Sequence, residues 1–194
     1  AYGAARWEDL VRALANKAGR PLDPWAKAWV KQRGMPRVTV ERTLDAQGRL
    51  LGATLRQSDV LREGGRWPMR LRVLHLPSGA AAKARHEEVL LEKPRARVTF
   101  PAVENDGLVF ANDGDFGYGQ FLLDEASLDF ALEQVGTIDD ALLRALVLES
   151  LWESVREAEL DPERYAALAM KQLPAEKDDL TCLLYTSPSP RDVE

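Results

Sequence analysis

Apolar residues recur at helical spacing near the start of the chain, and this pattern predicts two helices between residues 6 and 33. The first helix is expected to end at Gly19, because glycine commonly follows the last turn of a helix. The second is expected to begin with Asp23 as its N-cap and Pro24 in its first position, and to end at Gly34. The apolar positions of the two helices are Trp7, Leu10, Val11, Leu14, Trp25 and Trp29.

After these helices, apolar and polar residues alternate, which is typical of half-buried β-strands. Val38, Val40 and Leu44 begin this pattern, and a polar turn at residues 45–48 separates them from the next strand. Short strands with turns at roughly 8–12-residue spacing predict an antiparallel β-sandwich over residues 36–123. The expected strands cover residues 38–44, 50–57, 67–73, 85–91, 96–100, 108–111 and 120–123.

Helical spacing returns at residues 124–135 and continues in a long amphipathic segment. Thr137 is the expected N-cap of that long helix, with Asp139 and Asp140 in its first turn, where the helix dipole favours acidic residues. A third helix is expected to start at Pro162. Helices joined by such short turns are typical of the start of a helical array.

The predicted fold class is therefore mixed α and β, in more than one domain. Residues 1–35 form a two-helix unit, residues 36–123 form the antiparallel β-sandwich, and residues 124–181 begin an α-helical repeat (superhelical) domain.

Residues 182–194 are expected not to be native. The stretch CLLYTSPSPRD at 182–192 back-translates without a mismatch to the transposase adapter of tagmentation sequencing libraries, so we interpret it as translated adapter. A Ser/Pro-rich disordered tail is the alternative. Cys182 is the one cysteine of the sequence, so the native part is expected to carry no thiol chemistry, and its compartment stays open between cytoplasmic, periplasmic and secreted.

Composition narrows the class of protein. The chain has 194 residues, of which 45% are hydrophobic, enough to bury a core rather than remain disordered. A net charge of −5 without a basic stripe argues against a nucleic-acid partner. We also expect no membrane-spanning helix, because no apolar run is long enough.

The two histidines give a near miss to a zinc motif. His86-Glu87-Glu88-Val89-Leu90 has leucine where H-E-x-x-H needs its second histidine, and the segment is expected to be a strand. His75 and His86 therefore do not supply a three-ligand zinc site, and we expect both to be ordinary strand residues. Neither is accompanied by the G-x-S-x-G sequence of a serine nucleophile.

The most distinctive stretch is the loop at residues 112–119, NDGDFGYG. It could bind calcium or a nucleotide, but the closing glutamate of an EF-hand and the Lys-Ser/Thr of a phosphate loop are both missing, so we expect a tight hairpin. Trp25 and Trp29 could form a ligand platform, but core packing is the preferred interpretation. Glu149 and Glu153 could act as an acid–base pair, but a solvated helix face is preferred. A small-molecule site at Trp67 and the loop is a further alternative.

Three stretches, taken in order, resemble zinc aminopeptidases of the aminopeptidase N type (gluzincins). Residues 19–41 (GRPLDPWAKAWVKQRGMPRVTVE) resemble the junction between the thermolysin-like catalytic domain and the sandwich of that family. LRQSD at 55–59, followed by Trp67-Pro68, resembles a strand end and the opening of the next strand. Residues 112–124 and 139–155 resemble the last sandwich hairpin and the first helices of the C-terminal domain.

The resemblance implies a zinc-dependent peptidase as the parent protein. Family members hold zinc with a helical H-E-x-x-H and a downstream glutamate, use the motif's glutamate as general base and a tyrosine on the oxyanion, and grip the substrate N-terminus with a G-x-M-E-N loop. None of these motifs occurs in this chain, and Tyr2 and Tyr118 stand in the wrong contexts for that tyrosine.

We therefore expect no catalytic, cofactor-binding or metal-binding residue in this chain, and an upstream zinc site. The parent, expected to be bacterial, would remove N-terminal residues from peptides, with the helical domain as a cap over its active site, and the present piece would be inactive alone. Residues 1–35 would then be the last helices of the catalytic domain, with an exposed apolar face around Trp7, Trp25 and Trp29. The alternative is a non-catalytic interaction module with the same sandwich and helical repeat.

Overall fold

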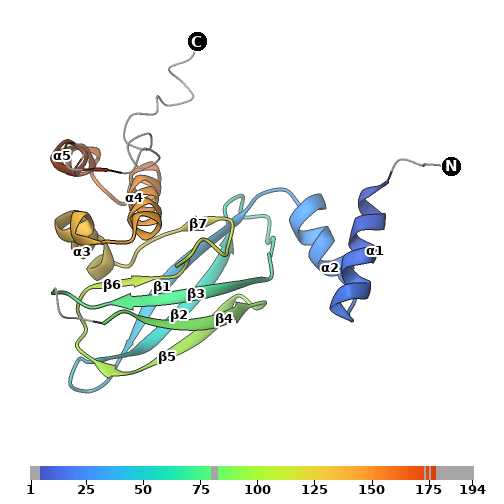
Figure 1. Cartoon of the computed structure of the whole chain (residues 1–194), viewed down its shortest axis with the longest axis horizontal. Helices are drawn as coiled ribbons and strands as arrows, with labels where there is room; N and C mark the ends of the chain where they lie inside the picture. The colour runs from blue at the N-terminus through green and yellow to red at the C-terminus, as the bar shows by residue number, and fades with distance from the viewer. Residues whose placement is uncertain (1–4, 80–82, 173, 175, 178–194) are drawn as a thin grey trace, which may run out of the picture.

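The computed structural model describes residues 5–79, 83–172, 174, 176 and 177. The expected adapter segment, 182–194, lies outside the described residues. Figure 1 shows two β-sheets in the middle of the molecule, a helix pair beyond one end and three further helices at the other end.

The N-terminal helix pair is held together by aromatic stacking. α1 (Trp7–Ala18) ends at Gly19 in the left-handed conformation, with φ 64°, as expected. α2 (Asp23–Ala26) continues as the π-helical turn η1 (Lys27–Lys31). The rings of Trp7 and Trp25 stack with centroids 6.4 Å apart.

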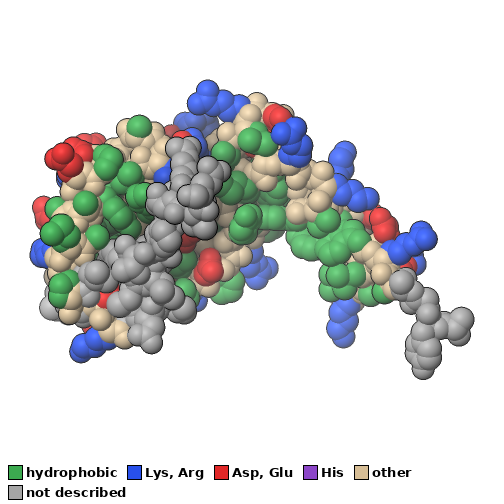
Figure 2. Space-filling model, turned by 90° about the horizontal axis from the view of Figure 1, so that it is seen from above, with side chains coloured by type: hydrophobic (Ala, Val, Ile, Leu, Met, Phe, Trp, Pro, Cys, Tyr) green, Lys and Arg blue, Asp and Glu red, His purple; other side chains and the backbone are tan. Residues whose placement is uncertain are grey.

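Two details of this pair differ from the prediction. Leu22, not Asp23, is the N-cap of α2, because the helix starts one residue earlier and places Asp23 in the first turn, beside the positive end of the helix dipole. The exposed apolar face was expected around Trp7, Trp25 and Trp29, but these side chains are half-buried. The exposed apolar side chains of the pair are instead Leu10, Leu14 and Val30. Figure 2 shows apolar side chains gathered on this arm of the molecule.

One sheet has four strands in the order β5-β2-β1-β7. β1 (Pro36–Leu44), β2 (Leu50–Asp59) and β5 (Arg95–Val103) pair antiparallel, as expected. β7 (Gln120–Phe121) pairs with β1 in parallel, with Arg37 opposite Gln120.

The second sheet has three strands in the order β4-β3-β6, all antiparallel. β3 (Met69–Leu76) lies at its centre, between β4 (Arg85–Leu91) and β6 (Leu108–Phe110). Because β6 belongs to this sheet and β7 to the other, the loop at 112–119 is a crossover between the two sheets. The tight hairpin expected there is therefore wrong.

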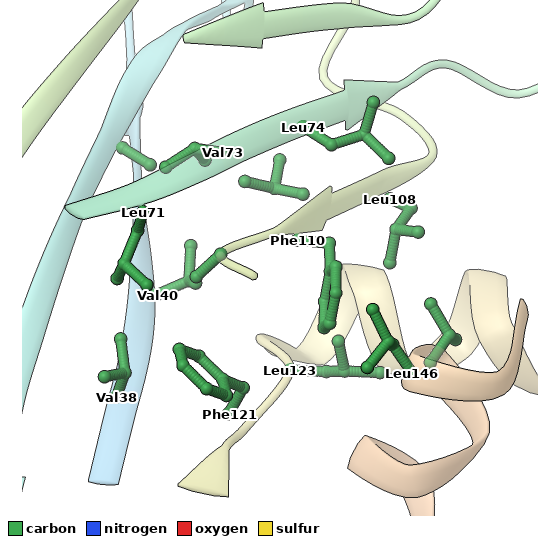
Figure 3. Packing of buried hydrophobic residues seen from close by; sticks show 14 of the residues in the cluster. Val38, Val40, Leu71, Val73, Leu74, Leu108, Phe110, Phe121, Leu123 and Leu146 are labelled. Carbon is green, nitrogen blue, oxygen red and sulfur yellow. The ribbon is translucent and has the colours of Figure 1, made fainter. Parts of the chain in front are cut away.

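The core fills the space between the sheets and continues without a break into the helices. Figure 3 shows Val38, Val40, Leu71 and Val73 between the strands, with Leu146 of the helical part close to Phe110, Leu123 and their neighbours. Burial of this apolar surface is the main favourable contribution to folding. The division of the chain into domains at 35 and 123 stays a prediction.

Three α-helices follow the sandwich. α3 (Glu125–Gln134) is capped by Asp124, whose carboxylate accepts a hydrogen bond from Ser127 N, and the 3₁₀ turn η2 (Val135–Thr137) follows it. α4 (Ala141–Arg156) and α5 (Pro162–Gln172) complete the helical part.

The expected N-cap of the long helix is wrong by three residues. The carboxylate of Asp140 accepts a hydrogen bond from Leu143 N and caps α4. The Thr137 hydroxyl instead donates to Gln134 O at 2.7 Å, which closes the preceding turn. Among the described residues, no helix is long and apolar enough to cross a membrane.

Candidate functional site

The crossover loop between β6 and β7 is held by the side chain of Asn112. Its Oδ1 accepts from Gly117 N at 2.7 Å, and its Nδ2 donates to Gly117 O at 3.1 Å and to Asp115 Oδ1 at 3.2 Å. Asp115 adopts a positive φ of 57°, a conformation that aspartate tolerates better than most residues. The loop is thus a defined structure, and Phe116 and Tyr118 project from it exposed to solvent.

Asp113 ties this loop to the three-stranded sheet. Its buried Oδ2 accepts from Arg72 Nε at 2.6 Å and lies 2.9 Å from His86 Nδ1. Its own N–H donates to Arg72 O at 3.0 Å, and the Arg72 guanidinium lies 5.3 Å from the Phe116 ring centroid. The side chains of Arg72 and His86 already contact this oxygen. The carboxylate therefore acts as a structural anchor rather than as a calcium ligand.

A cavity of about 270 Å³ lies between the crossover loop and α4. No basic side chain lines it among the described residues, whereas Asp115, Glu149 and Glu153 do. Burial raises the pKa of Glu149, and the neighbouring carboxylates of Asp115 and Glu153 raise it further. We refer to this cavity as the acidic hollow.

The interpretation of Glu149 and Glu153 as a solvated face fails for Glu153. Its side chain is 13% exposed. Oε2 accepts from Gln120 Nε2 at 2.6 Å, and Oε1 accepts from Arg156 Nη1 at 2.6 Å. Both carboxylate oxygens are therefore engaged, which leaves Glu153 poorly suited to proton transfer in this structure.

The two histidines point to opposite faces of their sheet, because Leu74 pairs with His86 and His75 pairs with Arg85. His75 is fully buried between the sheets, where its ring lies 5.8 Å from that of Phe100. His86 lies on the other face, beside Asp113. The two histidines therefore cannot bind the same metal ion. Within the described ranges, no group of three or more His, Cys, Asp and Glu residues could hold a metal ion.

The aromatic residues considered in the sequence have structural surroundings. Trp29 Nε1 donates to Pro68 O at 3.0 Å and joins η1 to the start of β3. Trp67 is buried in the core, and its backbone N–H donates to Gln57 Oε1 at 2.8 Å. Tyr118 is exposed on the crossover loop, and Tyr2 lies outside the described residues.

Two arginines of β1 that sequence reasoning did not single out connect the sandwich to the helices. Arg42 bonds Asp124, and Arg37 bonds Gln120 and Glu157. The two residues of a pair lie up to 120 positions apart in the sequence, as for Arg37 and Glu157. No local sequence pattern indicates such pairs.

Comparison with known proteins finds relatives among aminopeptidases. Over 188 residues, covering 92% of this chain, the sequence is 30% identical to Aminopeptidase N of Streptomyces lividans. The fold matches that of Legionella pneumophila aminopeptidase A in complex with aspartic acid, with a TM-score of 0.61, 17% identity and 97% of this chain covered. A scan against protein-family models finds no match.

The described residues form two packed β-sheets followed by a group of packed helices. The sequence match to an aminopeptidase makes the chain a peptidase-related segment, and its fold matches a stretch of an aminopeptidase structure. Its sequence likeness is to aminopeptidase N, and it spans 22% of the length of that curated relative.

Proposed function

We propose that this chain is the sandwich and first helices of a zinc-dependent aminopeptidase that removes N-terminal residues from peptides. The observation that supports this most is the ordered match of 188 residues to the S. lividans Aminopeptidase N, at 30% identity. The same stretch keeps the fold of an aminopeptidase, at a TM-score of 0.61.

Within the described ranges, no group of residues fits a zinc site. His75 and His86 lie on opposite faces of a sheet, and the carboxylates of Asp113 and Glu153 are engaged by arginine, histidine and glutamine. The ligands of a parent enzyme would therefore lie elsewhere in its chain, where zinc would activate water for attack on the peptide bond. We propose that this segment alone is inactive and that it supports the active site as a spacer.

A chimeric enzyme tests this proposal. Residues 1–181 replace the matched stretch of the S. lividans enzyme, and hydrolysis of an aminoacyl chromogenic substrate is compared with that of the intact and stretch-deleted enzymes. We expect the chimera to stay within about tenfold of the intact kcat/KM and the deletion to be far less active. A chimera that folds and keeps its zinc, yet is no more active than the deletion, would contradict the proposal.

A non-catalytic interaction module is the alternative, favoured by the engaged carboxylates of the segment. It predicts an inactive chimera. Peptidase activity of the purified segment itself, dependent on added zinc and absent from a mock preparation, would contradict both interpretations.

A further inference from the structure

Both halves of α4 bury apolar side chains in the common core, Leu143 and Leu146 in the N-terminal half and Leu151 in the C-terminal half. The two halves differ in their polar contacts with the sandwich. The C-terminal half faces the sandwich across the acidic hollow. Among the described residues, every hydrogen bond or ion pair that joins this half to the sandwich involves Arg37 or Gln120.

These polar contacts form a chain of four side chains. Arg37 Nε donates to Gln120 Oε1 at 3.0 Å, and Gln120 Nε2 donates to Glu153 Oε2 at 2.6 Å and to Glu157 Oε1 at 3.3 Å. Arg37 Nη2 pairs directly with Glu157 Oε2 at 2.5 Å. One arginine thus fixes both the glutamine and the last turn of the helix.

Arg42, on the same strand, makes a deeper connection to α3. Its guanidinium donates to Asp124 Oδ1 at 2.9 Å, Ser127 Oγ at 2.9 Å and Gly107 O at 2.8 Å. The same group also reaches Asn105 Oδ1 at 3.1 Å. Asp124 is the N-cap of α3, so this arginine holds the start of the helical part.

We infer that Arg42 is a fixed pin and that the Arg37–Gln120–Glu157 contacts are a releasable latch. The latch holds the C-terminal half of α4 over the acidic hollow. When it opens, this half and α5 tilt away about the pin, and the buried side chains that line the hollow, Gln120, Phe121 and Ser150, become open to solvent.

Solvent access separates the two connections. The Arg42 and Asp124 side chains are 8% and 13% exposed, whereas those of Arg37 and Glu157 are 22% and 27% exposed. Water and salt weaken an ion pair more as its exposure increases, while an ion pair that loses one buried partner leaves a costly unpaired charge. The latch is therefore the connection that opens first.

Repulsion between like charges across the hollow favours that opening. Glu149 and Glu153 line the hollow from α4. Asp115 adds a further negative charge from the crossover loop. Arg37 and Arg156 are the basic side chains that oppose this repulsion.

Hydrogen exchange measured by mass spectrometry on the whole chain tests the latch. In Arg37→Met we expect the amides of residues 112–121 and 148–158 to exchange about tenfold faster, because a hydrogen-bonded charged group is lost and the local opening becomes easier. The strands at 69–76 and 85–91 should be unchanged. About 0.5 M NaCl should speed the same segments in the unsubstituted chain and have little effect in Arg37→Met.

Two further variants keep the test decisive. Glu157→Gln removes the charge from the helix side and should reproduce Arg37→Met even if that variant folds poorly. Arg70→Met removes an exposed pair with Glu88, 3.5 Å long, and should leave both segments unchanged. Unchanged exchange in the latch variants, or an equal increase over the whole chain, overturns the latch.

Discussion

At the scale of single residues, the buried histidine carries the clearest consequence. His75 lies in the core at the centre of the three-stranded sheet. Its Nε2 lies 3.0 Å from Asp106 O, and since a carbonyl only accepts, the proton sits on Nε2. Burial lowers the pKa of His75, and the positive charges of Arg42 and Arg85 lower it further against the partial opposition of the Asp106 contacts.

This lowered pKa predicts loss of stability in mild acid. The unfolded chain binds a proton at His75 near pH 6.5, while the folded chain does not until a lower pH, so the unfolded state is favoured as the pH falls below about 6.5. We expect His75→Gln, which keeps a donor for Asp106 O, to reduce the slope of unfolding free energy against pH below 6.5. The reduction cannot exceed about 1.4 kcal/mol per pH unit, the value for one proton.

Urea unfolding between pH 5 and pH 8 measures this slope, and His86→Gln, at a partly exposed position, serves as the control. An unchanged slope in His75→Gln would show that acid sensitivity arises at other groups.

At the scale of elements, the start of α4 depends on one carboxylate. Asp140 accepts from Leu143 N at 3.1 Å, while the exposed Thr137 hydroxyl bonds the preceding turn. We expect Asp140→Ala to lower the free energy of unfolding by about 1 kcal/mol, and Thr137→Ala to change it by less than about 0.5 kcal/mol. Chemical denaturation of the two variants in parallel checks this. The reverse order of effects would make Thr137 the cap.

The sequence predicted those features that depend on neighbouring residues. Alternation placed the strands from β1 to β7, and helical spacing placed α1, α3 and α4, since these periods follow from backbone geometry. The cap of α4 was wrong because several residues before it can accept a hydrogen bond, and spacing does not choose among them. The hairpin predicted at 112–119 was wrong because a glycine-rich loop looks the same whether it joins strands of one sheet or of two.

The candidate site was harder to predict than the fold. Asp113, Arg72 and His86 come from three different segments, and the acidic hollow needs α4 to lie over the crossover loop. The periodicity of a sequence carries no information about such long-range contacts, which form only when the two sheets pack together.

At the scale of the whole molecule, the N-terminal helix pair stands apart from the sandwich (Figure 1). Leu10 and Leu14 lie one turn apart on α1 and are 48% and 41% exposed, and Val30 is 48% exposed. Exposed leucines one turn apart, such as Leu10 and Leu14, favour association with another surface.

We expect the double substitution Leu10→Glu with Leu14→Glu to reduce self-association of the purified chain without lowering the unfolding temperature of the sandwich. Sedimentation velocity over a range of concentrations measures the association, and Leu61→Glu, at a similarly exposed leucine outside the pair, is the matched control. Equal association in the double variant and the unsubstituted chain would assign it to another surface.

The parallel pairing of β1 with β7 also affects how the chain folds during synthesis. Arg37 and its partner Gln120 are 83 residues apart. A ribosome adds roughly 5–20 residues per second, so one edge of β1 waits about 4–17 s for its partner strand after it has been made. During that time the unpaired edge is open to other extended chains, and the short strand β7 is what finally closes it.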